Sequence, residues 1–270
     1  MAVVGRMDAD ATRPMIRRST ASFTAIIEST GGRSAGIGPD GSPTFPDGTA
    51  ESLRALQIAH RACRRCVDAG FLPAARPVFS GRPGQRILLI GQAPGPVEHD
   101  VARPFSGRAG RQLIRWMVRA GFTDEADFRD RVYITSMTTC FPGRRPDGSG
   151  DRPPGAPELA LCRPWRDSLI ELLTPRLVVT VGALAAARYL PGRRLDDLVG
   201  TVFTEAGSVV DGAHGPIDRL VLPLPHPSGQ SRWLNDTLRA RRLEVALQHL
   251  HGLVPWAEAS GRQCYDPPRS

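Results

Sequence analysis

Residues 86–110 read RILLIGQAPGPVEHDVARPFSGRAG, an apolar run that passes into a loop rich in glycine and proline. The run Ile87–Gly91 is continuously apolar, which is typical of a strand in a parallel sheet with both faces covered by helices. Glycines and prolines in the loop allow the backbone to come close to a ligand or to another segment. The loop also carries Glu98, His99 and Phe105, so polar and aromatic side chains follow the strand directly.

Three further segments have the same apolar character, at Val132–Thr139, Leu177–Val181 and Leu220–Leu224. Stretches with helical spacing alternate with them. This alternation predicts a three-layer α/β/α sandwich with a central, mostly parallel four-stranded sheet. The helices are expected at Thr49–Arg65, Ala109–Ala120, Pro157–Leu173, Ala183–Leu190 and Leu234–Leu250.

The folded domain is expected at residues 49–254. Residues 1–48 are rich in Gly, Ser, Thr, Pro and Asp and show little periodicity, so we expect a largely disordered extension with at most a short helix near 20–28. Residues 255–270 are expected to form a C-terminal tail. The segment Gly143–Pro157 (GRRPDGSGDRPPGAP) is predicted to be a loop.

The 270-residue chain is 41% hydrophobic and contains no apolar run long enough for a membrane span, so a cytoplasmic protein is expected. Its formal net charge is +8, and all 35 basic residues are Arg. Such a surplus attracts polyanions, although charge alone does not distinguish nucleic acid from other partners. Without Lys, no side-chain amine can form a Schiff base, which excludes lyase chemistry through a Lys imine.

Cysteine use does not suggest a disulfide framework in a cytoplasmic chain. Cys63 and Cys66 form a C-x-x-C at the end of a predicted helix, Cys140 follows the second strand, and Cys162 precedes R-P-W. Taken alone, these residues are either metal ligands or buried core thiols with an incidental C-x-x-C.

The ligand site of such a fold is expected at the carboxyl ends of the strands. Three stretches meet there: GQAPGPVEHD (91–100), TSMTTC (135–140) and PHPSGQSRW (225–233). In the last of these, Pro225 and Pro227 restrict the backbone on both sides of His226. A histidine held in this way at a strand end indicates a functional role.

This combination resembles the uracil-DNA glycosylase superfamily, and more closely its iron–sulfur branch, the family 4 enzymes. There the first motif reads GEAPG, followed by ED and then GRPFVGRAG. Here it stands as GQAPG (91–95), then Glu98-His99, then RPFSGRAG (103–110). A C-x-x-C before it, two later cysteines and an H-P-S loop near the end agree in order, over about residues 50–252.

The resemblance implies that four cysteines are the thiolate ligands of a 4Fe–4S cluster, with tetrahedral zinc as the alternative. It also implies DNA containing uracil, or another deaminated base, as the partner of a protein expected to be monomeric. The metal ligands would be Cys63, Cys66, Cys140 and Cys162.

The reaction implied is removal of uracil: the base is flipped out of the stack and its N-glycosidic bond is hydrolysed, which leaves an abasic site. Fixed donors would stabilise the departing anion. The resemblance and the strand-end position suggest the ring of His226 and the backbone of Gln92 and Ala93 as these donors. Glu98 would lie beside the base near C5, and Phe105 would stack on it.

Two residues depart from the family pattern. Gln92 replaces the glutamate of GEAPG and cannot act as a base, although it can orient water. Ser136 replaces an Asn that reads the uracil edge, so Ser136 would have to contribute to base recognition. The residues expected to contact DNA are Ser228, Gly229, Gln230 and Arg232.

These features predict a monofunctional DNA repair glycosylase, a hydrolase with no lyase step because Lys is absent. Ser136 motivates an alternative, in which hypoxanthine or xanthine is the substrate. Gln92 motivates another, a non-catalytic binder of damaged or abasic DNA.

Overall fold

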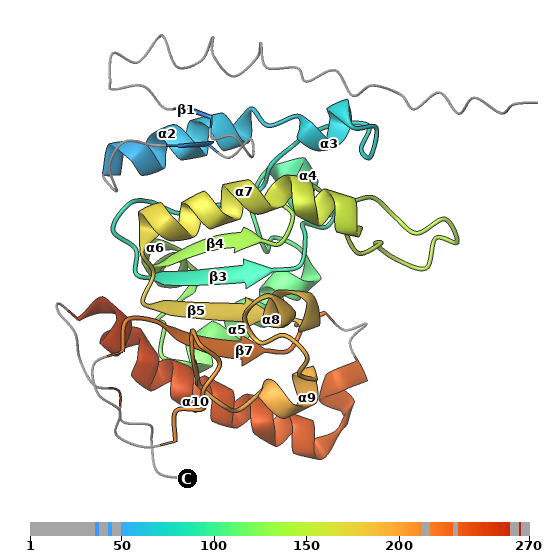
Figure 1. Ribbon diagram of the computed structural model, residues 1–270. Coiled ribbons are helices and arrows are strands. Elements are labelled where there is room, and N and C mark those ends of the chain that lie inside the picture. Colours follow the sequence, from blue (N-terminus) through green and yellow to red (C-terminus); the bar gives the residue numbers. More distant parts are fainter. Residues whose placement is uncertain are drawn as a thin grey trace, which may run out of the picture. The chain divides into compact units, whose positions relative to one another are not determined.

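The computed structural model describes residues 36–37, 43–44, 50–211, 217–228, 232–259 and 265; for 36–37, 43–44 and 232 it describes the backbone only. Figure 1 shows the elements of this part of the chain. Of the predicted extension, only the paired strands β1 (Gly36–Ile37) and β2 (Pro43–Thr44) are described, and the predicted helix near 20–28 lies outside the described residues.

The central sheet has five strands in the order β4-β3-β5-β7-β6. The four predicted strands are present and parallel, the second ending at Ser136 rather than at the expected Thr139, which confirms the mostly parallel α/β fold. The fifth strand, β6, was not predicted because it has two residues; it pairs antiparallel with the start of β7. The strands are β3 (Ile87–Gly91), β4 (Val132–Ser136), β5 (Leu177–Val181), β6 (Phe203–Thr204) and β7 (Leu220–Leu224).

The predicted helices are confirmed with shifted ends, and several short helices appear in addition. The last helix continues to Glu258, beyond the expected domain end at 254. The helices are α2 (Ala50–Arg61), α3 (Arg65–Asp68), α4 (Pro96–Val101), α5 (Arg108–Arg119), α6 (Glu125–Arg131), α7 (Ala156–Leu173), α8 (Ala183–Tyr189), α9 (Leu195–Leu198), the 3₁₀ helix η1 (Arg232–Asn235) and α10 (Thr237–Glu258).

Strand order determines which helices cover which face. The chain crosses from β3 to β4 in one direction, and from β4 to β5 and then β7 in the other. Right-handed crossovers in opposite directions place their helices on opposite faces of the sheet. Helices α5 and α6 therefore lie on one face and α7 and α8 on the other (Figure 1). The direction changes between β3 and β5, where a doubly wound sheet holds its ligand.

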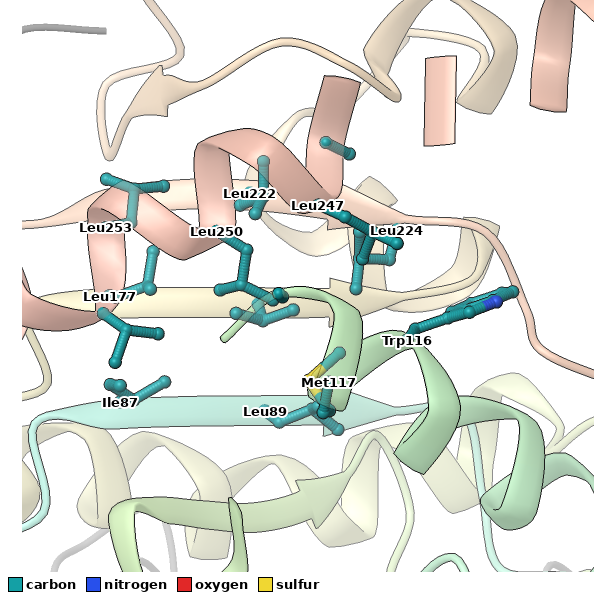
Figure 2. Close-up of a cluster of buried hydrophobic side chains, with 14 of the residues drawn as sticks. Ile87, Leu89, Trp116, Met117, Leu177, Leu222, Leu224, Leu247, Leu250 and Leu253 are labelled. Atoms are coloured by element: carbon teal, nitrogen blue, oxygen red, sulfur yellow. The ribbon is translucent and has the colours of Figure 1, made fainter. Parts of the chain in front are cut away.

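The main hydrophobic core lies between the sheet and helices α5 and α10 (Figure 2). Alternate residues of each strand point into it, because successive side chains of a strand face opposite sides. Each buried leucine stabilises the fold by roughly 1.5–3 kcal/mol relative to an exposed one. The labelled members are Ile87, Leu89, Trp116, Met117, Leu177, Leu222, Leu224, Leu247, Leu250 and Leu253.

Segment 78–80 runs along the outer edge of β4. The Ser80 N–H donates to the Ile134 carbonyl at 3.0 Å, and the Ile134 N–H donates to the Ser80 carbonyl at 2.7 Å. The Val78 N–H donates to the Thr139 carbonyl at 2.7 Å. This pairing holds Phe79, between the two donors, beside the loop that follows β4.

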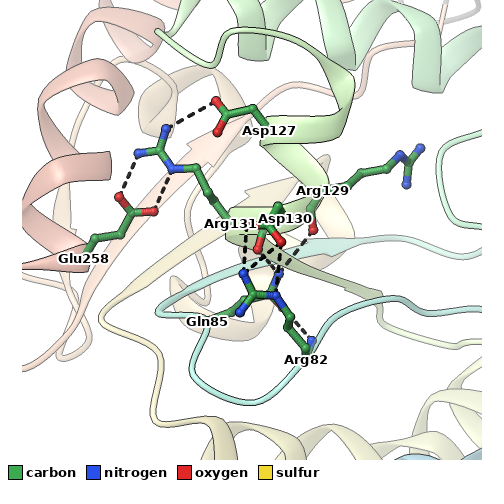
Figure 3. Close-up of polar contacts among 7 residues, drawn as sticks. All are labelled: Arg82, Gln85, Asp127, Arg129, Asp130, Arg131 and Glu258. Atoms are coloured by element: carbon green, nitrogen blue, oxygen red, sulfur yellow. Dashed lines mark hydrogen bonds and ion pairs between the residues drawn. The ribbon is translucent and has the colours of Figure 1, made fainter.

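Polar contacts stabilise the edge of the sheet formed by the amino ends of β3 and β4 (Figure 3). The buried Gln85 side chain donates to the carbonyls of Arg129 (3.2 Å) and Asp130 (2.8 Å) and accepts from the Arg82 N–H at 2.8 Å. Arg131 pairs with Glu258 at 2.8 Å and so joins α6 to α10. These contacts fix the amino end of β4. The ligand site is expected at the other, carboxyl end of the strand.

Candidate active site

Two glycines mark the point where the crossover direction changes. Gly91 ends β3, and Gly182 follows the neighbouring strand β5. A side chain on Gly91 would begin 3.1 Å from the Phe105 ring, and one on Gly182 would begin 3.5 Å from His226. Phe105 and His226, both predicted site residues, therefore lie against the carboxyl ends of the adjacent strands β3 and β5.

Phe105 adopts a backbone conformation that is unusual for a phenylalanine. Its φ is 53°, in the left-handed region. Gly110, in the first turn of α5, makes this possible, because a Cβ at that position would lie 1.9 Å from the Phe105 carbonyl oxygen. The Arg129 guanidinium donates to the same carbonyl at 3.3 Å. The RPFSGRAG motif thus places an aromatic ring against the end of β3.

Glu98 links the two arms of the loop. One carboxylate oxygen accepts from the N–H groups of Ser106 (2.9 Å) and Gly107 (2.8 Å), and the other accepts from the Gly95 N–H at 3.1 Å. Charge-assisted bonds of this kind are stronger than those between neutral groups. In this structure Glu98 therefore holds the two arms of the loop together. The position of Glu98 in the sequence did not predict these hydrogen bonds.

His226 is held in one tautomer. The Ser228 N–H donates to Nδ1 of His226 at 3.2 Å, and the Ser228 hydroxyl lies 2.9 Å from the same atom. A backbone N–H can only donate, so Nδ1 accepts and carries no proton. Burial lowers the pKa of His226 below 6.5, so the ring is neutral at pH 7 and its proton is on Nε2.

Residues of β3 and β4 continue their pairing into the site. The Met137 N–H donates to the Gly91 carbonyl at 2.9 Å, and the Thr138 N–H donates to the Gln92 carbonyl at 3.3 Å. The buried Ser136 hydroxyl donates to the Thr138 carbonyl at 2.8 Å. Its proton is used within the loop, so the Ser136 oxygen is left as an acceptor. Ala93, directly after Gln92, is partly buried.

The loop after β4 folds back as a small hairpin. Arg144 and Asp151 form an isolated bridge, and the Arg145 N–H donates to the Gly150 carbonyl at 2.8 Å. One Asp151 oxygen lies 3.4 Å from where a side chain on Gly95 would begin. Burial raises the pKa of the Asp151 carboxyl, and the negative charge of Glu98 adds to this. Sequence patterns gave no signal for this second carboxylate beside the GQAPG loop.

The four predicted metal ligands lie together. Cys63, Cys66, Cys140 and Cys162 line one pocket, with the apolar side chains of Leu72, Ala75 and Leu161. None of the four forms a disulfide. Glu158 also lines the pocket, but its carboxylate accepts from Arg152 at 2.7 and 2.8 Å and from the Gly155 N–H at 2.7 Å. Soft sulfur donors surrounded by apolar walls suit a thiolate-bound centre.

Without a bound cation, the pocket disfavours thiolates. Burial raises the pKa of Cys66 to about 12, and the neighbouring Cys162 and Cys63 add to this. Burial likewise raises the pKa of Cys140 to about 12, and it raises that of Cys162. Metal binding would supply the positive charge that holds these sulfurs deprotonated. Among the described residues, no group of three or more His, Cys, Asp and Glu side chains is arranged to hold a single metal ion.

Not every predicted site residue can be placed. Gly229 and Gln230 lie outside the described residues, and Arg232 is described only by its backbone, at the start of η1. His99 contacts Phe141, with ring centroids 6.1 Å apart, and its Nδ1 is buried without a hydrogen-bond partner in the described part of the chain. No described helix is long and apolar enough to cross a membrane.

Residues 79–251 match the protein family described as the uracil DNA glycosylase superfamily. Type-4 uracil-DNA glycosylases are among the similar proteins. The one from Sulfurisphaera tokodaii is 32% identical over 132 residues, which is 49% of this chain and 55% of that relative. The one from Thermotoga maritima is 29% identical over 167 residues, 62% of this chain and 77% of the relative. The one from Pyrobaculum aerophilum is 32% identical over 147 residues, 53% of this chain and 69% of the relative. The chain therefore belongs to the uracil-DNA glycosylase superfamily.

Proposed function

We propose that this protein is a monofunctional uracil-DNA glycosylase that hydrolyses the N-glycosidic bond of a flipped-out uracil. The observation that carries the proposal is the neutral His226, with its Nε2–H left to donate and its Nδ1 held by Ser228. Bond cleavage leaves negative charge on the departing base. A preorganised donor aimed at that charge stabilises the transition state more than the ground state.

Each residue of the proposed site would have its own role. His226 Nε2–H would donate to uracil O2, together with backbone N–H groups at Gln92 and Ala93. The Phe105 ring would stack on the base, a contact worth about 1–3 kcal/mol. Glu98 would hold the loop that carries these groups. Ser228, Gly229, Gln230 and Arg232 would contact the DNA, with Arg232 either filling the space of the flipped base or pairing with a phosphate.

We also propose that Cys63, Cys66, Cys140 and Cys162 bind a 4Fe–4S cluster. Support comes from the shared, apolar-walled pocket and from the family 4 pattern of the four cysteines. When bound, the cluster would join three segments of the chain that carry its ligands. Iron and sulfide analysis, with absorbance near 400 nm, tests the assignment, and a colourless zinc protein would contradict it.

One observation favours a second substrate class. Because the Ser136 hydroxyl donates to the Thr138 carbonyl, its oxygen can only accept from a base. An acceptor pairs with the N3–H of uracil, but it pairs equally well with the N1–H of hypoxanthine or xanthine. Ser136 would then discriminate less than the Asn of the family pattern.

Single-turnover base release from oligonucleotides that carry uracil, hypoxanthine or xanthine tests the proposal. We expect release of uracil with strand cleavage only after alkali treatment, because the chain has no Lys. His226→Ala should slow release by at least about 100-fold, whereas His249→Ala, on α10 beside Tyr265, should leave it near normal. Strand cleavage before alkali would contradict the monofunctional mechanism. Tight binding without release of any base would instead identify a DNA binder.

A further inference from the structure

Beside the cysteine pocket, three rings form a stack that no step of the proposed reaction uses. The His60 ring lies between Phe79, at a centroid distance of 4.8 Å and 17° between planes, and Trp165, at 4.8 Å and 2°. Two near-parallel rings at this distance must lie on opposite faces of the imidazole. We call Phe79, His60 and Trp165 the aromatic stack.

Two arginines close the ends of the aromatic stack. The guanidinium carbon of Arg61 lies 4.6 Å from the Phe79 centroid, and that of Arg65 lies 5.2 Å from the Trp165 centroid. The rings themselves are buried, with Trp165 only 1% exposed. Cation–π contacts and parallel stacking restrain the rings in rotation and in position.

Each end of this arrangement reaches a cysteine. The Trp165 indole N–H donates to the Cys63 sulfur at 3.2 Å. His60 Nε2 lies 2.9 Å from the Thr139 hydroxyl, which in turn lies 3.7 Å from the Cys162 sulfur. The stacked rings of Trp165 and His60 thus connect the hydrogen-bond donors of two of the four cysteine sulfurs.

The donor and acceptor roles in the hydrogen bonds from His60 through Thr139 to Cys162 follow from the chemistry of a metal-bound thiolate. Such a sulfur can only accept a hydrogen bond, so the Thr139 hydroxyl must give its one proton to Cys162. The Thr139 oxygen is then the acceptor from His60, which therefore carries its proton on Nε2. A neutral His60 ring is sufficient for these two hydrogen bonds.

We propose that Trp165 and the His60–Thr139 pair are positioning residues of the metal centre, holding the thiolates of Cys63 and Cys162 respectively. The inference rests on the proposed thiolate-bound centre. A hydrogen bond to a charged group withdraws electron density from the sulfur and fixes its orientation, and such outer contacts tune both affinity and potential.

The conservative test variants remove one donor each. Trp165→Phe keeps an aromatic ring in the stack but removes the N–H. Thr139→Val keeps the volume but removes the hydroxyl. In the purified, metal-loaded protein, each should shift the terminal Fe–S stretching bands of the resonance Raman spectrum to higher frequency, because a sulfur that has lost one hydrogen bond donates more strongly to iron. Each should also make the reduction potential more negative and speed loss of the centre to a chelator several-fold.

Matched controls separate this role from packing. Trp116 is buried as deeply as Trp165, at 1% exposure, but lies in the core on α5. Trp116→Phe should lower stability without moving the Raman bands. Thr139→Ser restores the hydroxyl and should return the bands to their wild-type positions.

Bands and potential unchanged in both Trp165→Phe and Thr139→Val would overturn the inference. If Trp165→Phe does not fold, Thr139→Val alone decides, since it replaces no residue of the aromatic stack. Uracil release is measured in the same preparations. A wild-type protein with a normal centre but no base release would contradict the glycosylase proposal and leave this one standing, whereas a protein without bound metal would contradict the centre and this inference together.

Discussion

A single carboxylate, Glu98, accepts hydrogen bonds from three backbone N–H groups on both arms of the loop after β3. These N–H groups belong to loop residues that no regular ladder satisfies. A carboxylate satisfies several donors at once because it accepts only. The loop thereby keeps one shape before any ligand is bound, which lowers the entropy lost on binding.

Glu98→Gln should therefore act first on stability. The amide offers one oxygen instead of two and directs an NH₂ group toward backbone donors. We expect the free energy of unfolding to fall by about 1–3 kcal/mol, with slower base release as a consequence. Urea unfolding measures the first effect and single-turnover assays the second.

Asp100→Asn, on the exposed side of the same helix, is the control and should change neither quantity. If Glu98→Gln keeps full stability but loses discrimination between uracil and thymine, then Glu98 acts at the edge of the base, as the family resemblance implied.

At the scale of elements, the turn from Phe105 into α5 depends on one glycine. Gly110→Ala would place a methyl group 1.9 Å from the Phe105 carbonyl oxygen, so the turn must move. We expect the variant to be destabilised by at least about 1–3 kcal/mol and to release uracil much more slowly, because the ring leaves the end of β3. Urea unfolding and single-turnover release are the measurements.

Gly252→Ala serves as the counterpart inside α10. A Cβ there would meet Tyr265 at 3.8 Å, an ordinary contact, and alanine favours a helix over glycine by about 1 kcal/mol. It should leave base release unchanged and stability equal or higher. A Gly110→Ala protein that behaves like Gly252→Ala would show that Phe105 does not depend on this turn.

The sequence predicted the four parallel strands because each is a short, mostly apolar run whose residues are all buried. Helix α6 was missed, although Asp124 caps it, because Phe128 is its one buried residue and gives no apolar period. Helix α4 was missed because it is short and begins with Pro96.

For the site, motif order predicted that His226 and Phe105 lie at the carboxyl edge of the sheet and that the four cysteines lie together, and the structure has this arrangement. The bonds of Glu98, the approach of Asp151 and the aromatic stack could not be predicted. They depend on how separate segments meet in space, and a single sequence does not encode that in any local pattern. The spacing of Trp165, three residues after Cys162 on a helix, was the one usable signal.

One buried and two partly buried imidazoles predict how the stability of the protein depends on pH. Burial lowers the pKa of His60 from 6.5 to about 3, and it also lowers those of His226 and His249. As the pH falls through 6.5, the unfolded chain takes up protons that the folded chain does not. Stability should therefore decrease from about pH 7 downward, by at most about 1.4 kcal/mol per pH unit for each histidine.

Urea unfolding between pH 7.5 and 5.5 measures this slope, with the absorbance of the proposed metal centre followed in the same samples to separate loss of the centre from unfolding. His249→Gln should make the slope shallower. A midpoint that stays constant or rises toward pH 5.5 would contradict the prediction.

The positions of the cysteines have a consequence for the order of assembly. Cys63 and Cys66 lie at the junction of α2 and α3, ahead of the sheet in the chain, whereas Cys140 follows β4 and Cys162 lies on α7. The pocket can therefore close only after β3, β4 and α7 have been made and packed. The proposed metal would tie α2 and α3 to the segments that carry Cys140 and Cys162, so without it we expect α2 and α3 to open locally, and to be cut by proteases, more readily than the sheet. The supply of metal in the cell, rather than the folding of the sheet, would then determine how long a newly made chain survives.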